Sequence, residues 1–267
     1  MIMNLMIRVA VFALLLSLSV ANDLQIDYQI KEGNARFVEK VVSNLDKNIV
    51  EYYTPQHNDV MESYKIQDFK RNKQITCLPI VNQCKLRDID KREMAGDAGS
   101  VMESYIHSWN KGVNSISSNE SHVIEEMYYV DGEEVTDTVS LGEDLRRFYE
   151  KFEYPLYIEK KVPDNAEILK IEQSADSGRR NKRRITTMNI DCKGQEAKLV
   201  YGLDTGRHCN YVRLCKERTG NILVPIRDCP AFHINAPTVM VCSCCPWVTS
   251  AIVQGRGNDC LCNKMNA

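Results

Sequence analysis

Cysteine is the residue type whose number and spacing offer the most chemistry in this chain of 267 residues. Nine of its eleven cysteines lie in the last 76 residues. Thiols at this density form disulfides in an oxidising compartment, whereas in a reducing one they more often bind metal ions or act in catalysis. The disulfide candidates are Cys77, Cys84, Cys192, Cys209, Cys215, Cys229, Cys242, Cys244, Cys245, Cys260 and Cys262.

The first 21 residues decide between these uses of cysteine. Arg8 is followed by an apolar run over 9–18 and by small residues up to Ala21, a pattern typical of an export signal. The apolar run is shorter than the ~20 residues that a membrane-spanning helix needs, although an N-terminal anchor is the alternative. We predict cleavage after Ala21 and a secreted, extracellular product that no longer contacts a membrane.

A zinc site is the alternative role for the clustered cysteines. Zinc sites usually separate paired cysteines by two to four residues, whereas the gaps here are zero and one. Because an exported chain also meets an oxidising environment, we predict disulfides, no bound metal and no cofactor. The ligands that this prediction sets aside are Cys242, Cys244, Cys245, Cys260, Cys262, His208 and His233.

A run of basic residues indicates a site of proteolytic processing. Arg180, Lys182 and Arg183 fit the Arg-x-Lys-Arg pattern cut by proprotein convertases, whose acidic pocket needs basic side chains at fixed positions. The alternative is a charge run that binds nucleic acid or heparin. The motif lies in the polar stretch 174–184, just before the cysteine density rises, which favours an exposed linker and processing. We predict cleavage after Arg183 and no nucleic-acid partner.

These sites divide the chain into a signal peptide (1–21), a leader (22–173), a linker (174–184) and a cysteine-rich domain (185–267). Residues 22–183 hold 23 basic and 30 acidic residues, a net charge of −7. Residues 184–267 hold 10 basic and 6 acidic residues, a net charge of +4. The opposite charges suggest that the leader partly masks the product; two merely soluble surfaces are the alternative.

The leader is predicted to be an α+β domain. Apolar residues recur with helical spacing over 37–50, 100–113 and 143–152. Asp131 and Gly132 separate two β-prone runs and predict a tight hairpin turn. Further strands are expected over 156–162 and 168–171. Cys77 and Cys84 enclose a short loop and are expected to bond to each other, and Asn119 lies in a glycosylation sequon.

The cysteine-rich domain is predicted to be small, all-β and held by disulfides. Its short β-branched runs lie at 185–190, 198–203, 210–214, 222–226, 238–241 and 247–253. The stretch 209–229 predicts a hairpin that turns at 219–221, with Pro225 on an edge strand. Nine cysteines are an odd number. We expect a disulfide-linked homodimer, with a buried free thiol or a bridge back to the leader as alternatives.

The layout of signal, convertase site and terminal Cys-x-Cys resembles that of cystine-knot growth factors and cytokines. The run 242–245 resembles the clustered cysteines of the knot, and Cys260 and Cys262 resemble its closing pair. Neurotrophins and Spätzle-type cytokines are similar in organisation. The resemblance implies a dimeric ligand whose cysteines form a knot, and receptors that bind its hairpin tips and edges.

The predicted function is that of a secreted signalling ligand that binds a cell-surface receptor after a convertase releases it. The candidate receptor contacts are basic residues near the hairpin tips: Arg207, Arg213, Lys216, Arg218 and Arg227. A disulfide-rich blocker of a protease or channel, and a matrix or egg-coat component, are the alternatives. None of the five histidines lies in a catalytic motif, so we predict that the protein is not an enzyme.

Overall fold

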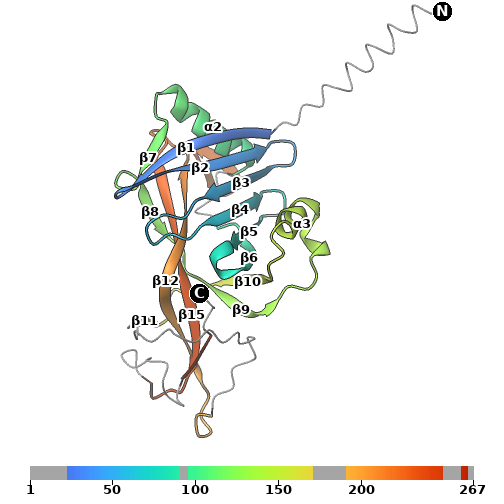
Figure 1. Cartoon of the computed structure of the whole chain (residues 1–267), viewed down its shortest axis with the longest axis vertical. Coiled ribbons are helices and arrows are strands. Elements are labelled where there is room, and N and C mark those ends of the chain that lie inside the picture. Colours follow the sequence, from blue (N-terminus) through green and yellow to red (C-terminus); the bar gives the residue numbers. More distant parts are fainter. Residues whose placement is uncertain (1–22, 91–95, 171–190, 249–259, 264–267) are drawn as a thin grey trace, which may run out of the picture.

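One large β-sheet dominates the fold (Figure 1). The computed structural model describes residues 23–90, 96–170, 191–248 and 260–263. Within them, fourteen strands form a single sheet in the order β11-β12-β15-β9-β10-β6-β5-β4-β3-β2-β1-β7, and β16 and β8 also pair with β15. Strands β13 and β14 form a separate two-stranded sheet.

The first six strands form an antiparallel meander because short turns join them. Four of these turns place an asparagine in the left-handed region, at Asn48, Asn58, Asn72 and Asn82, a conformation that asparagine tolerates better than most residues. The strands are β1 (Asp23–Glu32), β2 (Ala35–Asn44), β3 (Ile49–Thr54), β4 (Ser63–Asp68), β5 (Lys73–Leu78) and β6 (Gln83–Asp88).

Two α-helices of the described chain pack against different parts of the sheet. Helix α2 (Ala98–Asn110) contacts β2 and β12, whereas α3 (Glu143–Glu150) contacts β4 and β5. The predicted helices over 100–113 and 143–152 are thereby confirmed. Short 3-10 turns lie at Pro79–Val81 and Val139–Leu141.

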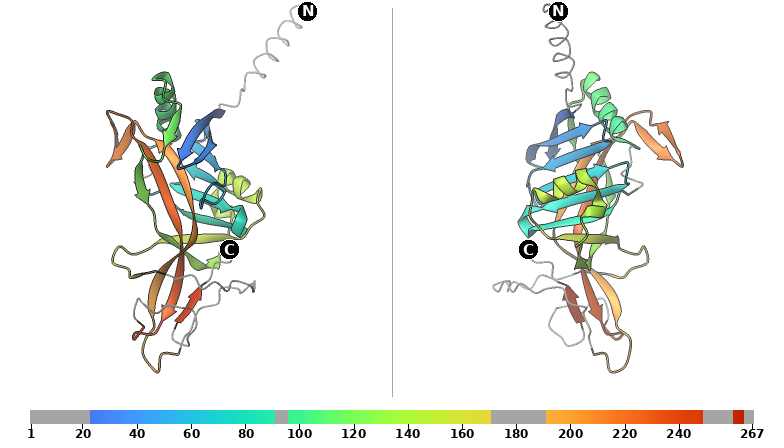
Figure 2. Two further views of the ribbon diagram at one scale, coloured as in Figure 1. Left: turned by 60° about the vertical axis from the view of Figure 1, so that its left-hand side comes forward. Right: turned by 90° about the vertical axis from the view of Figure 1, so that its right-hand side faces the viewer.

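The last third of the chain forms a long hairpin that joins the same sheet. Strand β15 (Ala231–Cys244) pairs antiparallel with β12 (Lys198–Arg213) and parallel with β8 (His122–Glu125) and β9 (Tyr128–Glu134). The long hairpin runs past the meander (Figure 2). The remaining strands are β7 (Ser115–Ser117), β10 (Leu156–Lys161), β11 (Ile168–Lys170), β13 (Lys216–Thr219), β14 (Ile222–Pro225) and β16 (Cys260–Asn263).

Two apolar cores lie on either side of the meander. One joins residues of β1, β2 and β3 to α2 and to the β12–β15 hairpin, with Tyr28, Tyr105 and Tyr211 fully buried in it. The other packs α3, through Leu145 and Phe148, onto β4, β5 and β6. Since the first core contains residues from both ends of the chain, the hairpin is part of the body of the protein.

The predicted fold class, an α+β leader followed by a small all-β domain, is wrong. The described chain is mostly β, and the cysteine-rich region contributes strands to the sheet that begins in the leader. The reason is that β15 pairs with β8 and β9, which lie more than a hundred residues earlier in the sequence. A pairing between such distant strands leaves no local signal in either segment.

The helix predicted over 37–50 is also wrong, because this region forms β2, a turn and β3. In β2 the inward side chains alternate, and Phe37, Glu39, Val41 and Ser43 are buried or partly buried. Alternation of this kind is the period of a strand. The charged Glu39 at an inward position interrupts the apolar pattern and hides that period.

A predicted turn and a predicted break between two strands are both irregularities within longer strands. Asp131 and Gly132 lie inside β9, where the register against β10 shifts and Gly132 has a positive φ of 42°. The runs predicted over 198–203 and 210–214 are one strand, β12, whose register against β15 shifts near Gly206. Extra residues in one strand of a pair make a bulge, and glycine supplies the backbone conformation that it needs.

Several local predictions are confirmed. Cys77 and Cys84 form a disulfide across β5 and β6. Strands β13 and β14 form a hairpin that turns around Gly220 as predicted, but it is shorter than the predicted 209–229 because the residues up to Arg213 belong to β12. Pro225 lies in β14, which pairs with β13 alone among the described strands. Strands β10 and β11 occupy the regions expected to be extended. Of the other predicted strands, 185–190 and most of 247–253 lie outside the described residues.

The N-terminus of α2 gives a testable contribution to stability. The Asp97 carboxylate accepts a hydrogen bond from the Ser100 amide at 2.7 Å. We expect Asp97→Ala to lower the free energy of unfolding by about 1 kcal/mol, measured by urea denaturation. Asp97→Asn keeps an acceptor and should lose less. An equal loss in the two variants would contradict the capping role.

Candidate functional site

The predicted cleavage residue, Arg183, divides the described chain into an N-terminal portion (23–170) and a C-terminal portion (191–263). The two portions meet along three strand pairings, β11 with β12, β8 with β15 and β9 with β15. Any release of the C-terminal portion after cleavage must break this interface. We therefore treat the interface as the candidate functional site.

The most strongly charged part of the interface surrounds Arg207 of β12. Its guanidinium donates to Glu32 Oε1 at 2.6 Å and to both carboxylate oxygens of Asp59 at 3.0 Å. Burial opposes ionisation of Glu32, but the hydrogen bond and the positive charge of Arg207 outweigh it and lower the pKa of Glu32. The hydrogen bond with Arg207 also lowers the pKa of Asp59. All three groups are therefore charged at neutral pH.

His57 completes this group, which we call the Arg207 cluster (Arg207, Glu32, Asp59 and His57). Its Nε2 lies 2.6 Å from Glu32 Oε2, and its Nδ1 lies 2.8 Å from the carbonyl oxygen of Pro55. Both partners are acceptors, so the ring donates to both only when each nitrogen carries a proton. The ring also stacks on Phe37, with centroids 3.8 Å apart.

Glu32, His57 and Cys209 lie within 4.8 Å of one another and have the residue types of a metal site or a cysteine nucleophile. The Arg207 guanidinium also contacts this group, because it donates to Glu32 and lies 3.3 Å from Cys209 Sγ. The positive charge of this guanidinium would repel a metal cation bound at the same place. Burial raises the pKa of Cys209 far above its usual range, and a neutral buried thiol is a poor nucleophile. The arrangement favours a structural ion cluster.

A second buried carboxyl contacts the C-terminal portion from β2. Glu39 is fully buried and accepts hydrogen bonds from Thr54, from the Asn210 side chain and from the Tyr211 amide. Burial raises the pKa of Glu39 to about 7, against the effect of these donors. The interface therefore contains a carboxyl group that changes its charge near neutral pH.

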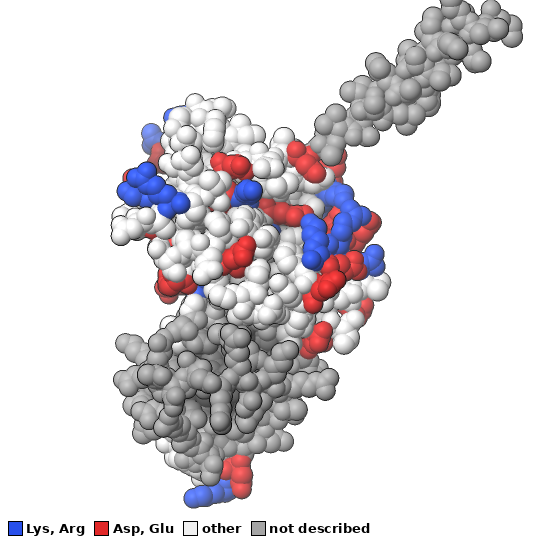
Figure 3. All heavy atoms as spheres, in the orientation of Figure 1, with Lys and Arg blue, Asp and Glu red and all other residues white. Residues whose placement is uncertain are grey.

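Two further ion pairs cross the interface, and they have the same polarity. Lys216 pairs with Glu103 at 2.5 Å, and Lys198 pairs with Glu167 at 3.3 Å. Together with the Arg207 pairs, each crossing pair that is described joins a base of the C-terminal portion to an acid of the N-terminal portion. On the face in Figure 3, the visible acidic and basic side chains of the described residues lie intermixed.

No disulfide crosses residue 183. Cys77 and Cys84 are the only cysteines before that residue, and they bond to each other. The C-terminal portion contains three described disulfides, Cys192–Cys245, Cys215–Cys229 and Cys244–Cys260. After cleavage the two portions are therefore held together by non-covalent contacts alone.

The four described disulfides indicate that the protein folds in an oxidising environment. Among the cysteines whose side chains are described, Cys209 alone is free, and it is buried. The structure thus has the buried free thiol that was one alternative to a dimer bridge. No helix within the described residues is both long and apolar enough to cross a membrane.

The sequence-predicted sites fall in different places. Ala21, Arg180, Lys182 and Arg183 lie outside the described residues. Asn119 is exposed in the turn between β7 and β8, where a glycan has room.

The candidate receptor contacts are not equally available. Arg207 lies in the Arg207 cluster, Lys216 pairs with Glu103, and Arg213 donates to the carbonyl oxygen of Cys229 at 3.0 Å. Arg227 is exposed. Nothing is described of the Arg218 side chain. The N-terminal portion therefore occupies two of the five candidates.

The acidic residues of the site were not among the functional residues predicted from the sequence. Glu32, Glu39, Asp59 and Glu103 belong to no motif, and only the net negative charge of the leader pointed to them. That charge predicted masking of the product but could not say which carboxylates face it.

Comparison of the chain with known proteins adds no relative. No family model, no curated protein and no solved structure matches it.

Proposed function

We propose that the protein is the exported precursor of a signalling ligand, and that the N-terminal portion keeps the ligand inactive after a convertase has cut after Arg183. The C-terminal portion is the ligand, and its receptor is a protein of the cell surface. Retention is non-covalent, so that the cut alone does not activate the ligand. Activation follows when the two portions separate.

One observation carries this proposal, the polarity of the ion pairs across the interface. Arg207, Lys216 and Lys198 of the C-terminal portion each meet carboxylates of the N-terminal portion. Two of these bases are among the residues that we expect to meet an acidic receptor surface. Charge complementarity selects partners and orients them, so a surface occupied by the N-terminal portion is not available to a receptor.

The strand pairings support the same proposal. Strand β15 is hydrogen-bonded to β8 and β9 of the N-terminal portion, which satisfies backbone groups that a free hairpin edge would present to water or to another chain. Several crossing contacts must therefore break together before the C-terminal portion can leave.

Cell binding tests the proposal. Three samples are compared on cells that respond to the protein: the uncut precursor, the cut complex, and the C-terminal portion separated from it in mild denaturant and refolded with its disulfides intact. We expect saturable binding of the separated portion alone. An Arg183→Ala precursor should keep its size after convertase treatment and should not bind. Equal binding by the uncut precursor and the separated portion would contradict the proposal.

The oligomeric state gives a further prediction. The one free thiol among the described cysteine side chains, Cys209, is buried, so the proposal does not include the interchain disulfide expected from the odd cysteine count. We expect the uncut precursor to migrate as a monomer in non-reducing electrophoresis. A band of twice the mass that disappears on reduction, and that persists in Cys209→Ser, would show that another cysteine joins two chains.

A further inference from the structure

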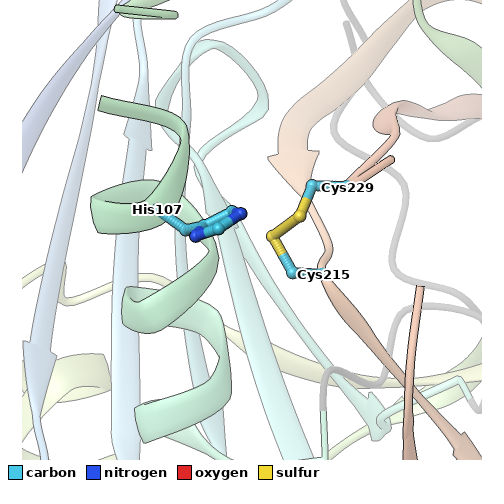
Figure 4. Close-up of side chains that lie close together, drawn as sticks. All are labelled: His107, Cys215 and Cys229. Atoms are coloured by element: carbon cyan, nitrogen blue, oxygen red, sulfur yellow. A yellow bond between two sulfur atoms is a disulfide. The ribbon is translucent and has the colours of Figure 1, made fainter. Parts of the chain in front are cut away.

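The disulfide between Cys215 and Cys229 lies against a histidine (Figure 4). A ring nitrogen of His107, in the last turn of α2, and the two sulfur atoms all lie within 4.8 Å of one another. The sulfurs are bonded to each other, so this group offers no metal site while the disulfide is intact. The imidazole is instead placed where it can act on the disulfide.

We propose that Cys215–Cys229 is a thiol–disulfide exchange site that reacts with small thiols of the glutathione class. The incoming thiolate sulfur bonds to Cys215 Sγ, the bond between Cys215 and Cys229 breaks, and its electron pair leaves on Cys229 Sγ. That sulfur takes a proton from the His107 imidazolium, and solvent reprotonates the ring. The small thiol is oxidised into a mixed disulfide on Cys215, and Cys229 is reduced to a thiol.

The exposure of the three residues determines which sulfur is attacked and which one leaves. His107 is exposed, Cys215 is partly buried and Cys229 is buried. An attacking thiolate therefore reaches Cys215 more easily than Cys229. A thiolate left on buried Cys229 is unfavourable because burial penalises the charged form. A proton donor within reach removes that charge as it forms, and its exposure lets it exchange protons with water.

Helix α2 also holds the disulfide in place. The Cys215 amide donates to Ser104 Oγ at 2.9 Å, one turn before His107 on the same helix. Lys216, the next residue, pairs with Glu103 of the same turn. The imidazole thus comes from the N-terminal portion and the disulfide from the C-terminal portion. Histidine-assisted exchange is a property of the two portions together.

The other disulfides provide an internal comparison. The cysteines of Cys77–Cys84 and Cys192–Cys245 are all buried, which shields them from thiols. Cys244–Cys260 resembles the proposed site, since Cys244 is buried and Cys260 is partly buried. Within the described residues, however, neither of its cysteines belongs to a cluster with a histidine. The rate at which Cys244–Cys260 reacts therefore serves as the reference for a disulfide of similar exposure that has no imidazole beside it.

The test exposes the folded full-length protein to reduced glutathione, traps new thiols by alkylation and maps the modified peptides by mass spectrometry. We expect glutathione on Cys215 and the alkyl group on Cys229 before any other disulfide opens. His107→Gln should slow this modification by at least about tenfold, without changing the rate at Cys244–Cys260. His122→Gln, which changes an exposed histidine of β8, is the matched control and should react like the wild type.

The pH dependence separates proton donation from a structural role. Divided by the thiolate concentration, the wild-type rate should fall with rising pH because the step consumes a proton of the imidazolium, whereas the His107→Gln rate should not. Unchanged thermal unfolding of His107→Gln shows that the fold is kept. The proposal is overturned if Cys244–Cys260 opens first, or if His107→Gln leaves either the rate or its pH dependence unchanged.

Discussion

Replacing Arg207 by alanine is expected to weaken the association of the two portions by about 3 kcal/mol, since removal of one member of a buried, hydrogen-bonded charge pair costs this much. The loss corresponds to about a 100-fold increase in the dissociation constant of the cut complex. Its cause is that the buried Glu32 loses the arginine that offsets the cost of burying its carboxylate. The measurement is the dissociation constant of the cut complex, by surface plasmon resonance or analytical ultracentrifugation.

The matched control is Arg227→Ala, which removes an exposed arginine from the same portion of the chain and should change the dissociation constant less than about twofold. If Arg207→Ala fails to fold, Arg207→Lys serves instead. It keeps one charge but cannot donate to Glu32 and Asp59 in the same forked geometry, and its effect should lie between those of wild type and alanine. Equal dissociation constants for Arg207→Ala and Arg227→Ala would refute the role of the Arg207 cluster.

The buried Glu39 should make the stability of the protein fall as the pH rises towards neutrality. Its pKa is raised by burial from 4.5 to about 7 in the folded protein. Between these values the folded state binds more protons than the unfolded state, so by linkage the free energy of unfolding decreases with rising pH. The expected decrease is about 3 kcal/mol, complete above the folded pKa.

Glu39→Gln isolates this effect, because glutamine has nearly the same shape and no charge to gain. Other groups also titrate, and burial lowers the pKa of His233, which gives the opposite slope. The quantity to compare is therefore the difference between the wild-type and Glu39→Gln curves of unfolding free energy, from chemical denaturation between about pH 4.5 and pH 8. A constant difference across this range would show that Glu39 keeps one charge state throughout.

Local chemistry made some elements of this fold predictable. The helical spacing of apolar residues over 100–113 identified α2, and the short loop between Cys77 and Cys84 identified their disulfide. The polar turn around Gly220 identified the β13–β14 hairpin. In each case the residues that determine the structure lie within one segment of the chain, so one sequence is enough to recognise them.

The arrangement of the sheet was not predictable in this way. Glu32 and Glu39 occupy inward positions of β1 and β2 because their partners come from β12, more than 170 residues later. Without those partners, a buried carboxylate contradicts the apolar pattern of a strand. Similarly, Gly132 was predicted to lie in a turn and Gly206 between two separate strands, but both lie at register shifts that long strands accommodate. The candidate site shares this property, since each of its ion pairs joins distant segments.

Gel filtration of the cut protein tests the central claim most directly. The protein is cut after Arg183 by a convertase, kept oxidised, and applied to the column at physiological salt. The account predicts that both fragments elute together at the volume of the uncut precursor, and that a denaturant separates them without a reducing agent. Separate elution of the two fragments under native conditions would contradict non-covalent retention of the C-terminal portion.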